Sequence, residues 1–241
     1  MSRSGLVIFT HVPKVAGTSV MHRLLHENYM PEDIKTYRGE LDLIRSRGRF
    51  RVLAGHSTWG AQYLAGDSAA GMFTMLRDPV ERAVSHYFFV KQPFLKEGKH
   101  GNHAQKRIHN ETPLANIFDR NRRRKWRLSG TWLIDNMQTR YLAGYAHFWK
   151  PADSPSLLRA AKRNLEKHYV EFGLQNEFEE SVTRLAAAFG WKIGNDVKIS
   201  KATRIEKDMN DEDRAAVVRW NKLDQDLFDF AEELFRKRGM S

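Results

Sequence analysis

The sequence of 241 residues contains no cysteine. Disulfide scaffolds, thiolate zinc sites and cysteine nucleophiles are therefore excluded, and nothing favours secretion into an oxidising compartment. No run of apolar residues approaches the roughly 20 that a membrane-spanning helix needs. The apolar residues 6–9 are too few for the hydrophobic region of a signal peptide. We therefore expect a cytoplasmic protein without a membrane span.

Acidic residues are also scarce relative to basic ones. Lys and Arg total 40 against 29 Asp and Glu, which gives a net charge of +11 with neutral histidines. A surplus of this size favours anionic partners such as nucleotides, polyanions, nucleic acid or an acidic membrane surface. The apolar fraction of 41% is sufficient for a hydrophobic core. No linker or internal repeat divides the chain, so we expect a single domain over residues 1–241.

Short apolar runs alternate with helical patterns along much of the chain. The predicted strands, typical of strands buried on both faces, are residues 6–10, 51–55, 72–76 and 169–174. The predicted helices, besides one that begins after residue 19, are residues 79–89, 156–167, 177–189, 211–221 and 223–236. Residues 91–113 lack any period and are expected to form a long loop. This alternation indicates an α/β fold with a central, mostly parallel sheet flanked by helices.

The first predicted strand leads into residues 11–19, whose sequence is His-Val-Pro-Lys-Val-Ala-Gly-Thr-Ser. A turn between a strand and a helix presents backbone N–H groups and the positive end of the helix dipole to an anion. Lys14 adds a positive charge, and Thr18 and Ser19 add hydroxyl donors. An ordinary strand–helix turn fits the same residues. The spacing disfavours a Mg-ATP loop, in which Gly-Lys-Ser/Thr is required, because here Lys14 precedes Gly17.

A second turn follows the third predicted strand, which ends at Arg77. Asp78 suits the N-cap of the helix that follows. Arg77 is expected at the edge of the sheet, and Ser85 lies about two helical turns further on. A guanidinium and a hydroxyl are a suitable pair of ligands for a phosphate. For Arg82 we expect an ion pair with Asp78 or Glu81 instead.

These two turns, in this order and on these elements, resemble the two donor-binding signatures of sulfotransferases that use 3′-phosphoadenosine 5′-phosphosulfate (PAPS). The closest resemblance is to sulfotransferase family 2, which includes the heparan and dermatan uronosyl 2-O-sulfotransferases and bacterial relatives. Residues 135–144 and 164–179 are similar to further segments of that family. The resemblance implies a P-loop-like nucleotide-binding fold and transfer of a sulfuryl group from PAPS to an acceptor hydroxyl, of saccharide type. Adenosine 3′,5′-bisphosphate (PAP) would be the product, and no metal is implied.

The resemblance also implies roles for individual residues. The residues that would hold the 5′-phosphosulfate are Lys14, Ala16, Gly17, Thr18 and Ser19. The residues that would hold the 3′-phosphate are Arg77 and Ser85. Lys201 and Thr203 belong to a basic segment that would close over the nucleotide.

The expected catalytic base is His56. In the uronosyl enzymes the catalytic histidine lies in a His-Gly-His sequence at the end of the next strand, and here the sequence is Ala54-Gly55-His56. A histidine just past a parallel strand lies where open α/β sheets bind ligands, and its ordinary pKa near 6.5 suits a base. A histidine packed at a strand end is the alternative. Lys14 would stabilise charge on the leaving phosphate. His11 is an expected contact of the acceptor. The uronosyl enzymes carry arginine at this position, so the histidine argues against a uronic-acid acceptor.

The acceptor is expected to bind around residues 91–127. Six of the eight residues in 120–127 are basic, so Arg124 and Trp126 could provide charge and a stacking surface for a sugar. A solvated basic helix end fits this segment as well. The histidines of the loop have no cysteine and no cluster of carboxylates near them, so we expect no metal site.

Two other functions fit parts of the sequence. A noncatalytic protein that binds polyanions or nucleic acid would explain the net charge of +11, although no nucleic-acid-binding module is recognisable. A divergent nucleotide kinase would explain the first turn. Neither alternative explains both turns together, so we expect an enzyme without nucleic acid as a partner.

Overall fold

The computed structural model of the protein describes residues 5–37, 40–95, 135–148, 150–151, 153–195 and 209–240. Five strands form one sheet in the order β2-β3-β1-β4-β5, and every neighbouring pair is parallel. The strands are β1 (Val7–Thr10), β2 (Ile34–Tyr37), β3 (Val52–Gly55), β4 (Gly71–Leu76) and β5 (Tyr169–Leu174). The structure thus confirms the α/β fold with a central parallel sheet, and the four predicted strands are all present.

The strands that were predicted are those buried on both faces. Every residue of β1, β3 and β4 is buried, so these strands carry continuous apolar runs. The fifth strand, β2, was not predicted. It lies at the edge of the sheet and contains Lys35 and Thr36, which are not buried, so its sequence lacks such a run.

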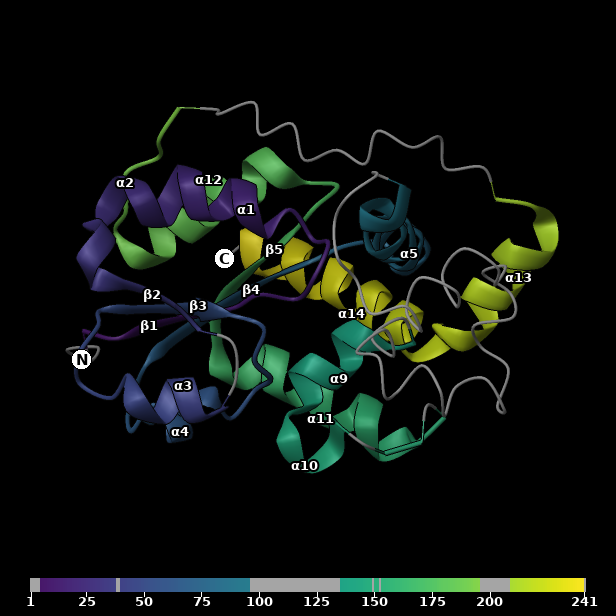
Figure 1. The fold of residues 1–241 in the computed structure, drawn as a ribbon, viewed down its shortest axis with the longest axis horizontal. Helices are drawn as coiled ribbons and strands as arrows, with labels where there is room; N and C mark the ends of the chain where they lie inside the picture. Colours follow the sequence, from purple (N-terminus) through teal and green to yellow (C-terminus); the bar gives the residue numbers. More distant parts are fainter. Residues whose placement is uncertain are drawn as a thin grey trace.

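Helices cover both faces of the sheet (Figure 1). One face packs against α1 (Gly17–Val20), the π-helical segment η1 (Met21–Leu25) and α12 (Phe178–Phe189). The other face packs against α3 (Glu40–Arg45), α4 (Ala61–Leu64), α11 (Pro155–His168) and α14 (Lys222–Gly239). Further short helices among the described residues are α2 (His26–Asn28), η2 (Pro31–Asp33), α9 (Met137–Ala143) and α10 (Tyr145–Phe148). Since residues of β1 alternate between the two cores, Ile8 packs on one side and Phe9 on the other.

Helix α5 (Pro79–Leu95) begins directly after β4 and packs against α13 (Asp211–Trp220). Asp78 caps α5 as predicted, because its Oδ1 accepts the Glu81 N–H at 2.8 Å. The predicted start of a loop at residue 91 is wrong, since the helix continues to residue 95. Phe88 packs in the apolar cluster shared with α13, a contact that local sequence does not reveal. Residues 96–113 of the expected loop lie outside the described residues.

The strand order brings the ends of three strands together. β1 lies between β3 and β4, and all three run in the same direction. His11 follows β1, His56 follows β3 and Arg77 follows β4. The carboxyl edge of a parallel sheet is where α/β proteins bind ligands. Three of the predicted site residues are therefore neighbours at this edge.

Candidate functional site

The turn after β1 has an unusual backbone. Lys14 and Ala16 adopt left-handed conformations, with φ of 73° and 64°, although neither is glycine. Such conformations carry a strain that is typical of functional sites. Runs of this kind turn successive N–H groups toward one point and form concavities that bind anions. Thr18 and Ser19 follow in the first turn of α1, where the Ser19 N–H donates to the carbonyl of Ala16 at 3.0 Å.

Gly17 allows the His11 ring to approach this turn closely. A methyl group at Gly17 would overlap the His11 ring. The ring also stacks on Phe9, with centroids 5.1 Å apart and planes at 11°. On another side it lies 4.8 Å from the ring of His56. The first turn and the two histidines are therefore packed against one another.

His56 is exposed, and one of its ring nitrogens is already engaged. Its Nδ1 lies 2.7 Å from the carbonyl oxygen of His11. A carbonyl oxygen only accepts hydrogen bonds, so Nδ1 carries the hydrogen and donates it. The lone pair of the neutral ring then lies on Nε2, which is the tautomer that a general base acting through Nε2 requires.

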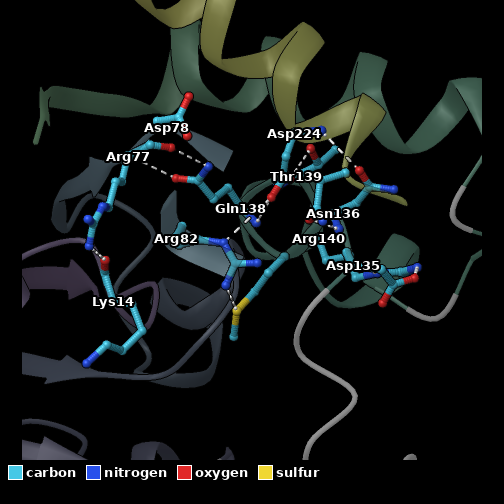
Figure 2. Close-up of polar contacts among 12 residues, drawn as sticks. Lys14, Arg77, Asp78, Arg82, Asp135, Asn136, Gln138, Thr139, Arg140 and Asp224 are labelled. Atoms are coloured by element: carbon cyan, nitrogen blue, oxygen red, sulfur yellow. Dashed lines mark hydrogen bonds and ion pairs between the residues drawn. The ribbon is translucent and has the colours of Figure 1, made fainter. Parts of the chain in front are cut away.

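Arg77 brings the second turn against the first (Figure 2). Its Nη1 donates to the backbone carbonyl of Lys14 at 3.3 Å, and its Nη2 lies 2.8 Å from Oε2 of Glu81. Figure 2 also shows the Lys14 ammonium pointing away from Arg77, and this group lies 4.2 Å from the centre of the Phe89 ring. Two turns that are 63 residues apart in the sequence therefore meet through a direct contact.

The two polar residues further along α5 are buried. Ser85 is 4% exposed, and its expected contact with a phosphate stays a prediction. The prediction for Arg82 is wrong, because this fully buried side chain forms its ion pair with Asp224 of α14, at 3.9 Å from Nε to Oδ2. Its Nη1 also lies 3.0 Å from the sulfur of Met137. α5 turns Arg82 inward toward α9 and α14, which leaves Glu81 to pair with Arg77.

The buried polar residues behind Arg77 were not predicted as site residues, although Gln138 lies in the segment 135–144 that resembles the family. Gln138 of α9 bonds to both backbone groups of Arg77, accepting from its N–H at 2.9 Å and donating to its C=O at 2.8 Å. Asp224 accepts from the N–H groups of Gln138 and Thr139 at 3.2 and 2.8 Å, so it caps α9. Burial raises the pKa of Asp224 and lowers that of Arg82, while the attraction between the two charges opposes both shifts.

Several predicted site residues cannot be placed. Lys201, Thr203, Arg124 and Trp126 lie outside the described residues, and their roles stay predictions. The described part of the chain contains no group of three or more His, Asp or Glu residues that could hold a metal ion. Among the helices of that same part, none is both long and apolar enough to cross a membrane.

A comparison with known proteins agrees with this arrangement. The model of the sulfotransferase family matches residues 1–231, which include both turns and α9. No curated protein matches the chain. The family match covers nearly the whole chain, and the fold is the parallel α/β arrangement expected for it. The chain belongs to the sulfotransferase family, whose reaction is the transfer of a sulfuryl group.

Proposed function

We propose that the protein transfers a sulfuryl group from PAPS to a hydroxyl of an acceptor, of saccharide type. The observation that carries this proposal is the contact between the two turns, in which the Arg77 guanidinium lies 3.3 Å from the Lys14 carbonyl. A single nucleotide with phosphates at both its 5′ and 3′ positions could reach both turns. A donor with only a 5′-phosphate chain would leave Arg77 unused.

The 5′-phosphosulfate would bind to the turn after β1. The backbone from Lys14 to Thr18 would supply N–H donors, Thr18 and Ser19 would supply hydroxyls, and the Lys14 ammonium would supply charge. This ammonium now lies over the exposed ring of Phe89, a contact that a phosphosulfate can replace because a full negative charge attracts the ammonium more strongly than a ring does.

The 3′-phosphate would bind to Arg77, with Ser85 as a further contact. The planar guanidinium can donate two parallel hydrogen bonds to phosphate oxygens. Its present partner, Glu81, has a side chain that is 60% exposed. Water screens the exposed Glu81 carboxylate, so a doubly charged phosphate can compete for the guanidinium.

The reaction needs a base, a charge stabiliser and correct positioning. The acceptor oxygen forms a bond to the donor sulfur while the bond from sulfur to the 5′-phosphate oxygen breaks, and PAP leaves. Nε2 of His56 takes the proton of the acceptor hydroxyl, a role that typically contributes about 10²–10⁴-fold in rate. Lys14 stabilises the negative charge that grows on the leaving phosphate. His11, in contact with His56, would face the acceptor, together with Arg124 and Trp126.

A transfer assay tests the reaction. PAPS labelled with ³⁵S is incubated with the protein and a panel of polysaccharides, glycolipids and small hydroxyl compounds. We expect label to move to at least one saccharide, with an equal amount of PAP released. Release of PAP without a labelled acceptor, or label on none of the panel, contradicts the proposal.

A binding assay distinguishes the alternatives. The midpoint of thermal unfolding is measured with PAP, with Mg-ATP and with an oligonucleotide, because a ligand that binds the folded state raises the midpoint. We expect selective stabilisation by PAP. Selective stabilisation by Mg-ATP supports a kinase instead, and stabilisation by the oligonucleotide alone supports a nucleic-acid-binding protein.

A further inference from the structure

The side chain of Gln138 forms hydrogen bonds with both backbone groups of Arg77, as a neighbouring strand of a sheet would. Its side-chain amide accepts the Arg77 N–H at 2.9 Å and donates to the Arg77 C=O at 2.8 Å. Arg77 is the first residue past β4, where the ladder of the sheet has ended. With both backbone groups bonded, the direction in which the Arg77 side chain leaves the backbone is fixed. The Gln138 side chain does not itself reach solvent, since the residue is 1% exposed.

Gln138 is in turn held by the C-terminal helix. Its own N–H donates to Asp224 at 3.2 Å, and the Thr139 N–H and hydroxyl donate to the same carboxylate at 2.8 and 2.7 Å. Asn136 adds a return contact, because its side-chain oxygen accepts the N–H of Asp224 at 3.1 Å. Figure 2 shows these groups gathered where α14 meets the start of α9. The first turn of α9 is therefore fixed at several points.

A second arginine, Arg82 of α5, also contacts the first turn of α9. Arg82 lies five residues after Arg77, is fully buried and contacts both Asp224 and Met137. The strand end that carries Arg77 and the helix that follows it are thus both attached to the first turn of α9. Arg77 itself is 18% exposed at its side chain, so a rigid buried frame presents one accessible guanidinium.

We propose that the first turn of α9 positions Arg77 for the 3′-phosphate, with Gln138 as the positioning residue. This inference rests on the proposed function, because it takes Arg77 as the ligand of that phosphate. An arginine side chain has several rotatable bonds, and fixing its base lowers the entropy that is lost when its guanidinium is ordered on a phosphate. Selectivity for a 3′-phosphorylated nucleotide would then depend on a residue that never touches the nucleotide.

The test compares PAP with AMP, which lacks the 3′-phosphate, by isothermal titration calorimetry. Gln138→Met keeps the side-chain length and removes both hydrogen bonds to Arg77. We expect the Kd for PAP to rise about tenfold or more, the loss typical of a weakened hydrogen bond to a charged group. The Kd for AMP should change less than about twofold. A general loss of structure would instead weaken both ligands equally.

Gln62→Met is the matched control. Gln62 is also buried, at 4% exposed, and it also accepts a backbone N–H, from Gly60 at 3.0 Å. It belongs to α4, and none of its described hydrogen bonds reaches Arg77 or Lys14. For Gln62→Met we expect the ratio of the Kd for AMP to the Kd for PAP to match that of the unmodified protein.

A double-mutant cycle tests whether Gln138 acts through Arg77. In the background of Arg77→Ala, Gln138→Met should cause no further loss of PAP affinity. Equal losses in both backgrounds would overturn the positioning role. If Gln138→Met fails to fold by circular dichroism, Gln138→Glu replaces it, because a carboxylate still accepts the Arg77 N–H. We then expect an intermediate loss of selectivity for PAP, and an unchanged ratio of Kd values overturns the inference.

Titration of the unmodified protein distinguishes failure of the proposed function from failure of the positioning role. If it binds PAP no more tightly than AMP, the proposed function fails and this inference fails with it. If it prefers PAP and folded Gln138→Met keeps the same preference, only the positioning role fails.

Discussion

His11 and His56 follow neighbouring strands, and each limits what the other can do. The carbonyl of His11 holds Nδ1 of His56 at 2.7 Å, so the histidine after β1 selects the tautomer of the histidine after β3. The rings are also in contact, with centroids 4.8 Å apart. A catalytic base needs both a defined tautomer and a fixed position. These contacts provide both for His56.

Replacing His56 should affect the chemical step and leave donor binding nearly intact. For His56→Ala we expect kcat to fall by about 10²–10⁴-fold, because the hydroxyl proton loses its acceptor. The Kd for PAP should stay within about twofold, since the proposed phosphate ligands lie on the other two strand ends. His22→Ala, at an exposed histidine of η1, is the control and should keep full turnover. A His56→Ala variant with normal kcat removes this residue from the reaction.

Gly17→Ala should disturb the site through His11. The added methyl group overlaps the His11 ring, which is held between Phe9 and His56. Overpacking of this kind costs about 1–3 kcal/mol, and we expect that loss of unfolding free energy in urea. His11→Ala removes the obstructing ring. In the His11→Ala background, Gly17→Ala should therefore cause a smaller loss of unfolding free energy than it does in the unmodified protein. Equal costs in the two backgrounds would show that the close approach is unimportant.

At the scale of elements, the stability of α9 depends on residues that are distant in the sequence. It has seven residues, and isolated helices of that length are not stable in water. Its first N–H groups are capped by Asp224 from α14, and its residues are buried throughout. The same carboxylate is the partner of the buried Arg82. One side chain therefore serves a helix terminus and an internal charge.

Asp224→Asn tests that double role. The variant leaves Arg82 buried beside an uncharged group, and removing one partner of a buried ion pair costs about 3–5 kcal/mol. Urea unfolding should show a loss of that order. Asp226→Asn, on the same helix, is the matched control: its partner Lys222 has a side chain that is 75% exposed, so its loss should stay below about 1 kcal/mol. Similar losses for the two variants would contradict the role given to Asp224.

Elements whose signal is local were predictable from the sequence. β4 and β5 are mostly apolar, and α5 begins with a capping aspartate, so all three were predicted with starts at or within one residue of those observed. Phe88 of α5 packs in a cluster with residues of α13, and three of the four residues of β2 are not buried. The local sequence therefore predicted neither the end of α5 nor the presence of β2.

The same division applies to the site. Lys14 and Arg77 were predicted because each lies in a recognisable turn next to a strand. Gln138 and Asp224 were missed, because their partners lie 61 and 86 residues away in the sequence and an isolated Gln or Asp carries no signal of its role. The misassigned partner of Arg82 has the same origin: Asp224 and Arg82 meet only in the folded chain. Short-range patterns therefore pointed to the proposed ligands of the nucleotide but not to the residues that hold those side chains in place.

At the scale of the whole molecule, the parallel sheet is what unites the site. The order β3-β1-β4 places three strand ends side by side, and helices on both faces hold the strands in that order (Figure 1). The net charge of +11 adds a general attraction for an anionic donor. The central claim is that one doubly phosphorylated nucleotide contacts both turns, so that loss of Arg77 affects only ligands that carry a 3′-phosphate.

Calorimetric titration of the unmodified protein and of Arg77→Ala with PAP and with AMP tests this claim most directly. Arg159→Ala, at an exposed arginine of α11, serves as the control for loss of one positive charge. We predict that the unmodified protein prefers PAP, and that Arg77→Ala raises the Kd for PAP by about 10–100-fold while the Kd for AMP stays nearly constant. Equal losses for the two nucleotides, or no preference for PAP in the unmodified protein, would contradict the account.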